Sequence, residues 1–278
     1  MPRLQLLGQH LAALPGLRLE CSWRLLDGRL QTRPKPMFWL GAAHRHSRVD
    51  FDRLHGLLSA LECPSAWLEL HRQYSVTSRY QGVAVDLDAR HNRGTLFMHY
   101  RDETGERRLG LAWDGDNLQR SEYCSARLSQ SGEHHRLLHQ VHAVHRDLLA
   151  ALLRDTRLLD QGGYWVQHRQ GQAIEIYLTY PWHPSSGQLW QPFDTRLLAR
   201  LPDGWQRHQE VLIRHIGFSC QSVAEPTLTF YTPLPRPDVW PSSQAMLERG
   251  LYTPTQADAA GANGHCPLTA IKEDSSGR

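Results

Sequence analysis

The feature that most restricts the fold of this chain is a strict alternation of residue types that recurs in paired segments. In Gly94–Arg101 (GTLFMHYR), one strand face receives threonine, phenylalanine, histidine and arginine, and the other receives leucine, methionine and tyrosine. Because successive side chains of a β-strand point to opposite faces, such segments predict strands with one polar and one apolar face. The same period occurs in Arg18–Leu25, Gly82–Asp88, Tyr164–Arg169, Ala173–Tyr180, Glu210–Cys220 and Thr227–Leu234.

Helical spacing of apolar residues separates these strand pairs and predicts helices over Asp50–Leu61, Ser65–Arg72 and Glu133–Leu159. Alternating hairpins and helices favour an antiparallel sheet whose apolar face is covered by helices. Closure into a barrel would enclose the polar face as a solvated lumen, whereas a flat sheet with one solvent-exposed face gives the same alternation. The polar face would carry Glu20, Asp86, Asp88, His99, Arg101, Glu175, Tyr177 and Tyr231.

Length and composition set the class of protein. The 278 residues suffice for a substantial core, and the net charge of +3 is too small to indicate nucleic-acid binding. The five cysteines are widely spaced without a CxxC, and no basic N-terminal segment leads into a long apolar run, so we expect a reduced, cytoplasmic protein. No window of about 18 apolar residues predicts a membrane span. We expect one domain over residues 1–250 and a loosely ordered tail over 251–278, and a monomer.

Four segments taken together resemble the paired strands of cyanobactin-type peptide prenyltransferases. They are Leu19-Glu20 with Ser22, Ala84–Asp88 followed by Thr95–Arg101, Gly171 with Ile174–Tyr177, and Ser219 through Pro226 to Phe230-Tyr231. The resemblance implies an α+β fold of the ABBA type, in which repeated α-β-β-α units form a ten-stranded antiparallel barrel with a polar lumen, ringed by helices. Four hairpins are evident in the sequence, and the fifth would come from the weakly patterned Arg107–Arg127 region or from elsewhere.

The activity that the resemblance implies is prenyl transfer from an allylic diphosphate, dimethylallyl or geranyl, to a side chain of a ribosomally made peptide, linear or macrocyclic. The dimethylallyl diphosphate co-substrate would be accompanied by Mg²⁺. Glu20 matches the family's catalytic glutamate and would act as the general base. The diphosphate would be held by Arg33, Lys35, His99 and Arg101, and the allylic cation would be shielded by Phe97, Tyr177 and Tyr231.

One departure from the family concerns Phe97, because several members carry a diphosphate-binding lysine at this position. A phenylalanine cannot bind phosphate, so another cation substitutes, the donor sits differently, or the enzyme is impaired. With Asp86, Asp88 and Glu175 as acceptor-binding residues, the lumen would be negative and would slightly favour an arginine guanidinium over tyrosine, tryptophan or histidine as acceptor.

Two other functions are compatible with the same sequence. One is a barrel that binds a small ligand or peptide without chemistry, and the other is an ABBA prenyltransferase that acts on a small aromatic molecule. A metal site is not expected: His135, His139 and His142 share a face of the predicted helix, but no carboxylate lies at metalloprotease spacing, so we interpret this face as solvated.

Overall fold

The computed structural model describes residues 6–7, 10, 18–26, 29–30, 35–40, 48–74, 78, 80–86, 92–103, 105–130, 132–179 and 215–233. The predicted tail over 251–278, together with Arg33 and Asp88, lies outside these residues. The strands are β1 (Arg18–Leu26), β2 (Arg29–Leu30), β3 (Lys35–Leu40), β4 (Tyr80–Val85), β5 (Arg93–Asp102), β6 (Gly105–Asp114), β7 (Asn117–Arg127), β8 (Gly163–Arg169), β9 (Gln172–Thr179), β10 (His215–Ser219) and β11 (Leu228–Pro233). The helices are α2 (Arg48–Ala60), α3 (Ser65–Tyr74), α4 (Glu133–Gln140), the 3-10 helix η2 (Ala143–His145), α5 (Arg146–Leu152) and α6 (Thr156–Gln161).

The sheet closes on itself. In the described part of the chain, the order β11-β10-β9-β8-β7-β6-β5-β4-β3-β1 is completed by a β1–β11 pairing, and every pairing is antiparallel. The two-residue β2 extends β1 outside this ring. The predicted ten-stranded antiparallel barrel is therefore confirmed, and the flat-sheet alternative is excluded. The fifth hairpin is β6–β7, in the region where the sequence pattern was weakest.

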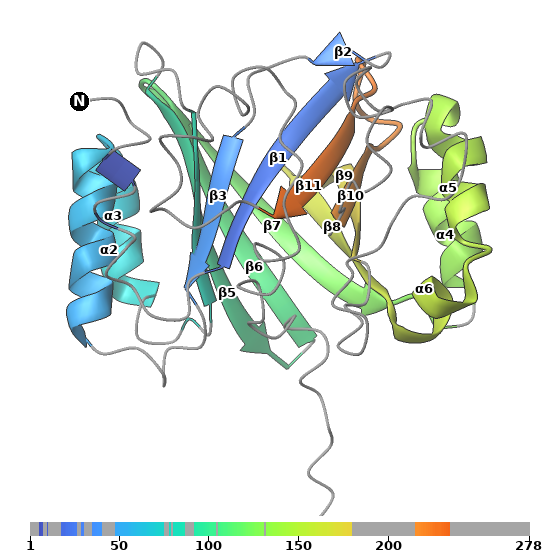
Figure 1. Ribbon diagram of the computed structural model, residues 1–278, viewed down its shortest axis with the longest axis horizontal. Coiled ribbons are helices and arrows are strands. Elements are labelled where there is room, and N and C mark those ends of the chain that lie inside the picture. Colours follow the sequence, from blue (N-terminus) through green and yellow to red (C-terminus); the bar gives the residue numbers. More distant parts are fainter. Residues whose placement is uncertain are drawn as a thin grey trace, which may run out of the picture.

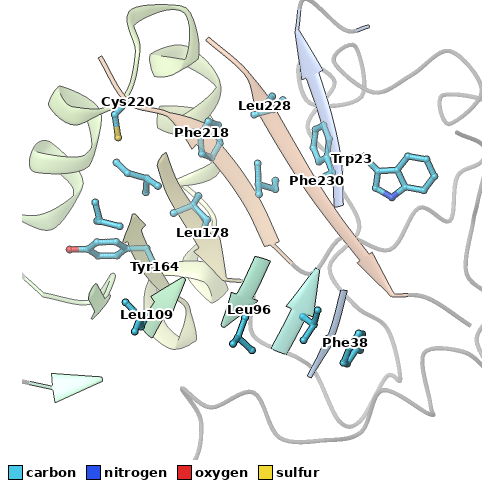
Figure 2. Close-up of a cluster of buried hydrophobic side chains, with 14 of the residues drawn as sticks. Trp23, Phe38, Leu96, Leu109, Tyr164, Leu178, Phe218, Cys220, Leu228 and Phe230 are labelled. Carbon is cyan, nitrogen blue, oxygen red and sulfur yellow. The ribbon is translucent and has the colours of Figure 1, made fainter. Parts of the chain in front are cut away.

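The helices cover the barrel from two sides. Figure 1 shows α2 and α3 against one wall, and α4 and α5 against the opposite wall. The outward strand positions and the helices form one apolar core, part of which Figure 2 shows, with Trp23, Phe218 and Phe230 fully buried. None of the described helices has the length and apolar character needed to cross a bilayer.

A second, smaller apolar cluster lies inside the ring. It contains Met37, Ala84, Phe97, Tyr123 and Trp165. Both faces of the barrel wall therefore carry apolar residues: the outer face packs against the helices, and the inner face holds this second cluster. The middle of the lumen is aromatic, and its polar residues lie on either side of this belt.

The prediction of one long helix over Glu133–Leu159 is wrong, because the end of the barrel captures the chain in the middle of this segment. Val141 adopts an extended conformation and forms an isolated bridge with Cys220. The His142 N–H donates to the Ser219 carbonyl at 2.9 Å, so backbone pairing with the sheet replaces helical hydrogen bonds. Helix α4 therefore ends at Gln140, and His142 does not share the face on which the rings of His135 and His139 meet.

Two histidines join α2 and α3 to the barrel. The buried His71 ring donates from Nε2 to Gln81 Oε1 at 2.7 Å on β4, and its Nδ1 lies 3.2 Å from His55 Nδ1. Burial lowers the pKa of His71, and burial followed by the charge of Arg72 lowers the pKa of His55. Both side chains are therefore neutral in the folded protein near neutral pH.

We expect the free energy of unfolding to fall as the pH drops below about 6.5, the ordinary histidine pKa. In this range the unfolded chain binds protons that the folded chain rejects at His71 and His55, so acid favours unfolding. The slope is at most about 1.4 kcal/mol per pH unit for each histidine. Urea titrations from pH 7.5 to 5.5 check this, with His71→Gln as the reference variant. An equal acid loss in wild type and variant would contradict the assignment.

Candidate functional site

A cavity of about 740 Å³, its open end included, occupies the middle of the lumen and one end of the barrel. Every lining residue comes from a strand, so the closed ring fixes their positions. The lining comprises Glu20, Met37, Trp39, Tyr80, Phe97, His99, Arg108, Tyr123, Trp165, Tyr177, Thr179, His215 and Tyr231. The combination of many aromatic rings with a few ionisable groups is typical of a small-molecule site.

Aromatic rings form a nearly continuous belt around this cavity. The centroid distances along it are 5.2 Å from Trp39 to Phe97, 6.0 Å from Phe97 to Tyr123, 6.0 Å from Tyr123 to Tyr177 and 5.7 Å from Tyr177 to Tyr231. Burial raises the pKa of all three tyrosines, so their hydroxyls stay neutral at physiological pH.

Glycines make room for this belt. A Cβ atom on Gly82 would lie 2.3 Å from the ring of Trp39, and one on Gly110 would lie 2.8 Å from the ring of Tyr123. Both glycines occupy inward positions of their strands, so each ring lies close to backbone that carries no side chain. The belt therefore depends on positions that carry no side chain of their own.

Glu20 lies on β1, with its carboxylate 3% exposed at the edge of the cavity. Its Oε1 lies 3.8 Å from His215 Nε2, and His215 Nδ1 lies 3.1 Å from the Thr179 hydroxyl oxygen. The imidazole is more exposed than the carboxylate, at 20%. A buried carboxylate is thus connected through an imidazole to the open end of the cavity.

A second pair of a carboxylate and an imidazole stands on another part of the wall. His99 Nε2 on β5 lies 2.8 Å from Glu106 Oε2 on β6, and both side chains are almost fully buried. The imidazole ring meets Trp165 edge-on at a centroid distance of 5.1 Å and lies 5.4 Å from Tyr80. The ring is therefore held in one orientation toward the cavity.

The guanidinium of Arg108 is enclosed by aromatic faces. Its Cζ lies 4.4 Å from the ring centroid of Trp165 and 4.5 Å from that of Trp39, with Tyr123 at 5.7 Å and Phe97 at 6.0 Å. Burial lowers its pKa, although an arginine remains charged at any physiological pH. Within the described part of the chain, its buried Nε makes no hydrogen bond.

The cavity brings together five of the residues that the sequence singled out, namely Glu20, Phe97, His99, Tyr177 and Tyr231. Lys35, Asp86 and Glu175 face the lumen beyond the aromatic belt and are not part of the lining. Arg101 is exposed at the end of β5.

Glu175 serves a different purpose from Glu20. Its carboxylate accepts hydrogen bonds from the Thr229 and Tyr177 hydroxyls at 2.8 Å each, and Arg24 Nη2 lies 3.4 Å away. The charge of Glu175 raises the pKa of Arg24. Lys35 lies close enough to Arg24 and Asp86 to feel their charges, and burial followed by the charge of Arg24 lowers its pKa.

Sequence reasoning missed several lining residues. Arg108 and its strand neighbour Glu106 were hidden because the inward positions of β6 continue as Gly110 and Ala112, which give no polar alternation. His215 is the first described residue of β10, and residues 210–214 of the predicted strand Glu210–Cys220 lie outside the described part of the chain. Trp165, Thr179 and Tyr80 look like ordinary strand residues and give no signal of their own.

The described residues include no cluster of three or more histidines, cysteines or acids that could hold a metal ion. Glu20, Glu106 and Glu175 each have a neighbouring imidazole or donors, so the lumen does not fit a protein-held magnesium ion. The Mg²⁺ that the sequence resemblance implies would need to be held by phosphate oxygens and water.

Comparisons with known proteins gave neither a matching family model nor a matching curated sequence. Among solved structures, the chain is similar to 5-dimethylallyltryptophan synthase from Streptomyces coelicolor, with 11% identity over 83% of this chain and 95% of that chain and a TM-score of 0.49. It is also similar to the prenyltransferase PriB in its apo form, with 12% identity over 78% and 79% of the two chains and a TM-score of 0.47. PriB has also been solved in a ternary complex with L-tryptophan and dimethylallyl thiolodiphosphate.

Proposed function

We propose that the chain is a prenyltransferase that moves a dimethylallyl or geranyl group from an allylic diphosphate to an acceptor inside the barrel. The observation that carries this proposal is the position of a buried carboxylate, Glu20, at the edge of a cavity walled by aromatic rings. The sequence resemblance to peptide prenyltransferases points to the same chemistry.

Each part of this wall suits one requirement of prenyl transfer. When the bond between the allylic carbon and the diphosphate oxygen breaks, positive charge develops on the allyl group. The faces of Phe97, Tyr177 and Tyr231 stabilise a nearby cation and exclude water that would capture it. Because burial raises the pKa of the tyrosines, these rings stay neutral and do not compete as nucleophiles.

The acceptor supplies the electron pair for the new bond to the allylic carbon and loses a proton to the Glu20 carboxylate, and the bond electrons of the donor leave with the diphosphate. His99, fixed against Glu106, is on the donor side and donates to the diphosphate. Lys35 and Arg101 are candidates for a second contact to the same diphosphate. Lys35 would reach it from the far side of the aromatic belt, and Arg101 would reach it from the end of β5.

The acceptor that the charges favour is cationic. Glu20 places a carboxylate at the edge of the cavity, and Glu106 adds a second negative charge beside the lining residue His99. A bound diphosphate adds further negative charge. A guanidinium also fits between indole faces, as Arg108 does between Trp39 and Trp165. We therefore propose an arginine side chain of a peptide as acceptor, bound by Glu20. Glu175, whose carboxylate has three partners, and Asp86, beyond the belt, are less well placed for that task than the sequence suggested.

A peptide panel tests both the reaction and the acceptor. We would incubate the protein with dimethylallyl and geranyl diphosphate, with and without Mg²⁺, and matched cyclic peptides that differ at one position occupied by Arg, Tyr, Trp, His or Ser. We expect a mass gain of one prenyl group on the arginine peptide. Prenylation of arginine-free peptides alone would reject the arginine acceptor but keep the reaction. No product from peptides or from free tryptophan would favour the binding barrel.

A further inference from the structure

Arg108 differs from Arg24 and Arg93, two other arginines at inward strand positions. Arg24 lies 3.4 Å from Glu175, and Arg93 donates to Asp114 at 2.7 Å, so each of these charges has a carboxylate beside it. Arg108 instead lies against four aromatic rings, and its buried Nε makes no hydrogen bond to a described residue. The charge of Glu20 also acts on Arg108, but no ion pair of Arg108 with a described carboxylate is formed. Burying a guanidinium in this way is unfavourable unless something else compensates its charge.

The surroundings of Arg108 indicate what would compensate it. Its Cα lies opposite His99 on β5 and opposite Tyr123 on β7, so an imidazole and a phenol are its cross-strand neighbours. Together these groups offer hydrogen-bond donors, and the carboxylate beside them, Glu106, faces His99 rather than Arg108. A guanidinium fork next to further donors matches an anion with several oxygens, such as a diphosphate.

We propose that Arg108 is the anchor for the donor diphosphate, and that its guanidinium leaves the ring cage of Trp39, Trp165, Phe97 and Tyr123 when the diphosphate binds. The cage is then free for the prenyl chain. The identification of the anion as the diphosphate of an allylic donor rests on the proposed function, whereas the anion site itself rests on the geometry of Arg108.

The exchange follows from electrostatics. A guanidinium left in the cage would repel the allylic cation that forms there, because like charges at contact distance in a partly enclosed site interact strongly. Once paired with phosphate oxygens, the same guanidinium is neutralised and the ring faces are available to the allyl group. The free enzyme therefore keeps its cation-binding surface occupied until the donor arrives.

The test measures binding without turnover. Inorganic diphosphate and the thiolo analogue of dimethylallyl diphosphate are titrated by calorimetry into wild type, Arg108→Gln, Arg108→Lys and, as a charge control, Arg120→Gln on the exposed face of β7. We expect Arg108→Gln to weaken diphosphate binding by roughly 10- to 100-fold, because one charge-assisted contact is lost. Arg108→Lys should bind more tightly than Arg108→Gln, and Arg120→Gln should match wild type.

Thermal unfolding provides a second measurement. Without ligand, Arg108→Gln should unfold at the wild-type temperature or above it. Added diphosphate should raise the unfolding temperature of wild type and Arg120→Gln more than that of Arg108→Gln. Wild type should bind the thiolo analogue more tightly than inorganic diphosphate, because the vacated cage receives the alkenyl chain. Equal diphosphate affinity in wild type and Arg108→Gln overturns the anchor, and equal affinity for the two ligands overturns the exchange. An Arg108-dependent diphosphate site in a protein that transfers no prenyl group would refute the proposed function alone.

Discussion

Glu20→Gln is expected to lower the rate of prenyl transfer by about 10²- to 10⁴-fold, the range that a positioned general base contributes. Glutamine has the size of glutamate and keeps a hydrogen-bonding oxygen, but it cannot accept the acceptor's proton. Glu20 lies next to His215 and its negative charge also acts on Arg108, so removing that charge should not weaken binding of the diphosphate. Single-turnover product formation measured by mass spectrometry at saturating donor gives the rate.

The control for this variant is Glu122→Gln, which removes an exposed carboxylate on β7 that pairs with Arg120. It should leave the rate and the unfolding temperature unchanged. Glu20→Gln itself should be folded, because removing a buried charge relieves a desolvation penalty. A Glu20→Gln protein that retains more than about half of the wild-type rate would show that the acceptor loses its proton elsewhere, since a general base typically contributes at least 10².

The fold could be predicted from the sequence to the extent that alternation marks both strands of a hairpin. Gly94–Arg101 predicted most of β5 and the face that each residue occupies, because the inward Thr95, His99 and Arg101 differ clearly from their apolar outward neighbours. Alternation does not reveal whether a sheet closes, since closure depends on the single pairing of β1 with β11 between residues about two hundred positions apart. The prediction of a closed barrel therefore came from the resemblance to a known family and not from the periodicity of the strands.

The predicted end of the helix that begins at Glu133 was wrong for a related reason. The segment Glu133–Leu159 has a continuous helical pattern, but Val141 and His142 pair with Cys220 and Ser219 from the far end of the chain. A local pattern contains no information about a distant strand that competes for the same backbone groups. Tertiary pairing thus overrides propensity at this point.

The residues of the candidate site also divide into those that the strand pattern could predict and those that it could not. Glu20, His99, Tyr177 and Tyr231 could be predicted because they interrupt strands with polar or aromatic residues on the inward face. Arg108 could not, because Arg107 precedes it and Gly110 follows, so nothing in the sequence marks which arginine points inward. Only the pairing of β6 with β5 places Arg108 opposite His99. For Glu175 the inward position was correctly predicted, but the three partners of its carboxylate were not.

Those partners predict a clear loss of stability when the Glu175 side chain is removed. Glu175→Ala is expected to lower the free energy of unfolding by about 2–3 kcal/mol, because the buried Thr229 hydroxyl loses its acceptor and Arg24 loses its counter-charge. Tyr177 retains one acceptor, since its hydroxyl also donates to Gln167 Oε1 at 2.7 Å. Urea unfolding followed by tryptophan fluorescence measures the change.

Glu175→Gln is the matched variant, because its amide oxygen can still accept from the Thr229 hydroxyl and its amide nitrogen can donate to the Tyr177 hydroxyl, whose proton is then directed to Gln167. The variant removes the charge facing Arg24. The Arg24 side chain is half exposed, so water replaces much of that attraction and the loss should be at most about 1 kcal/mol. Thus the alanine variant should be clearly less stable than the glutamine variant. If both lose the same stability, the carboxylate acts mainly through its charge, and the hydroxyl contacts do not hold this end of the barrel together.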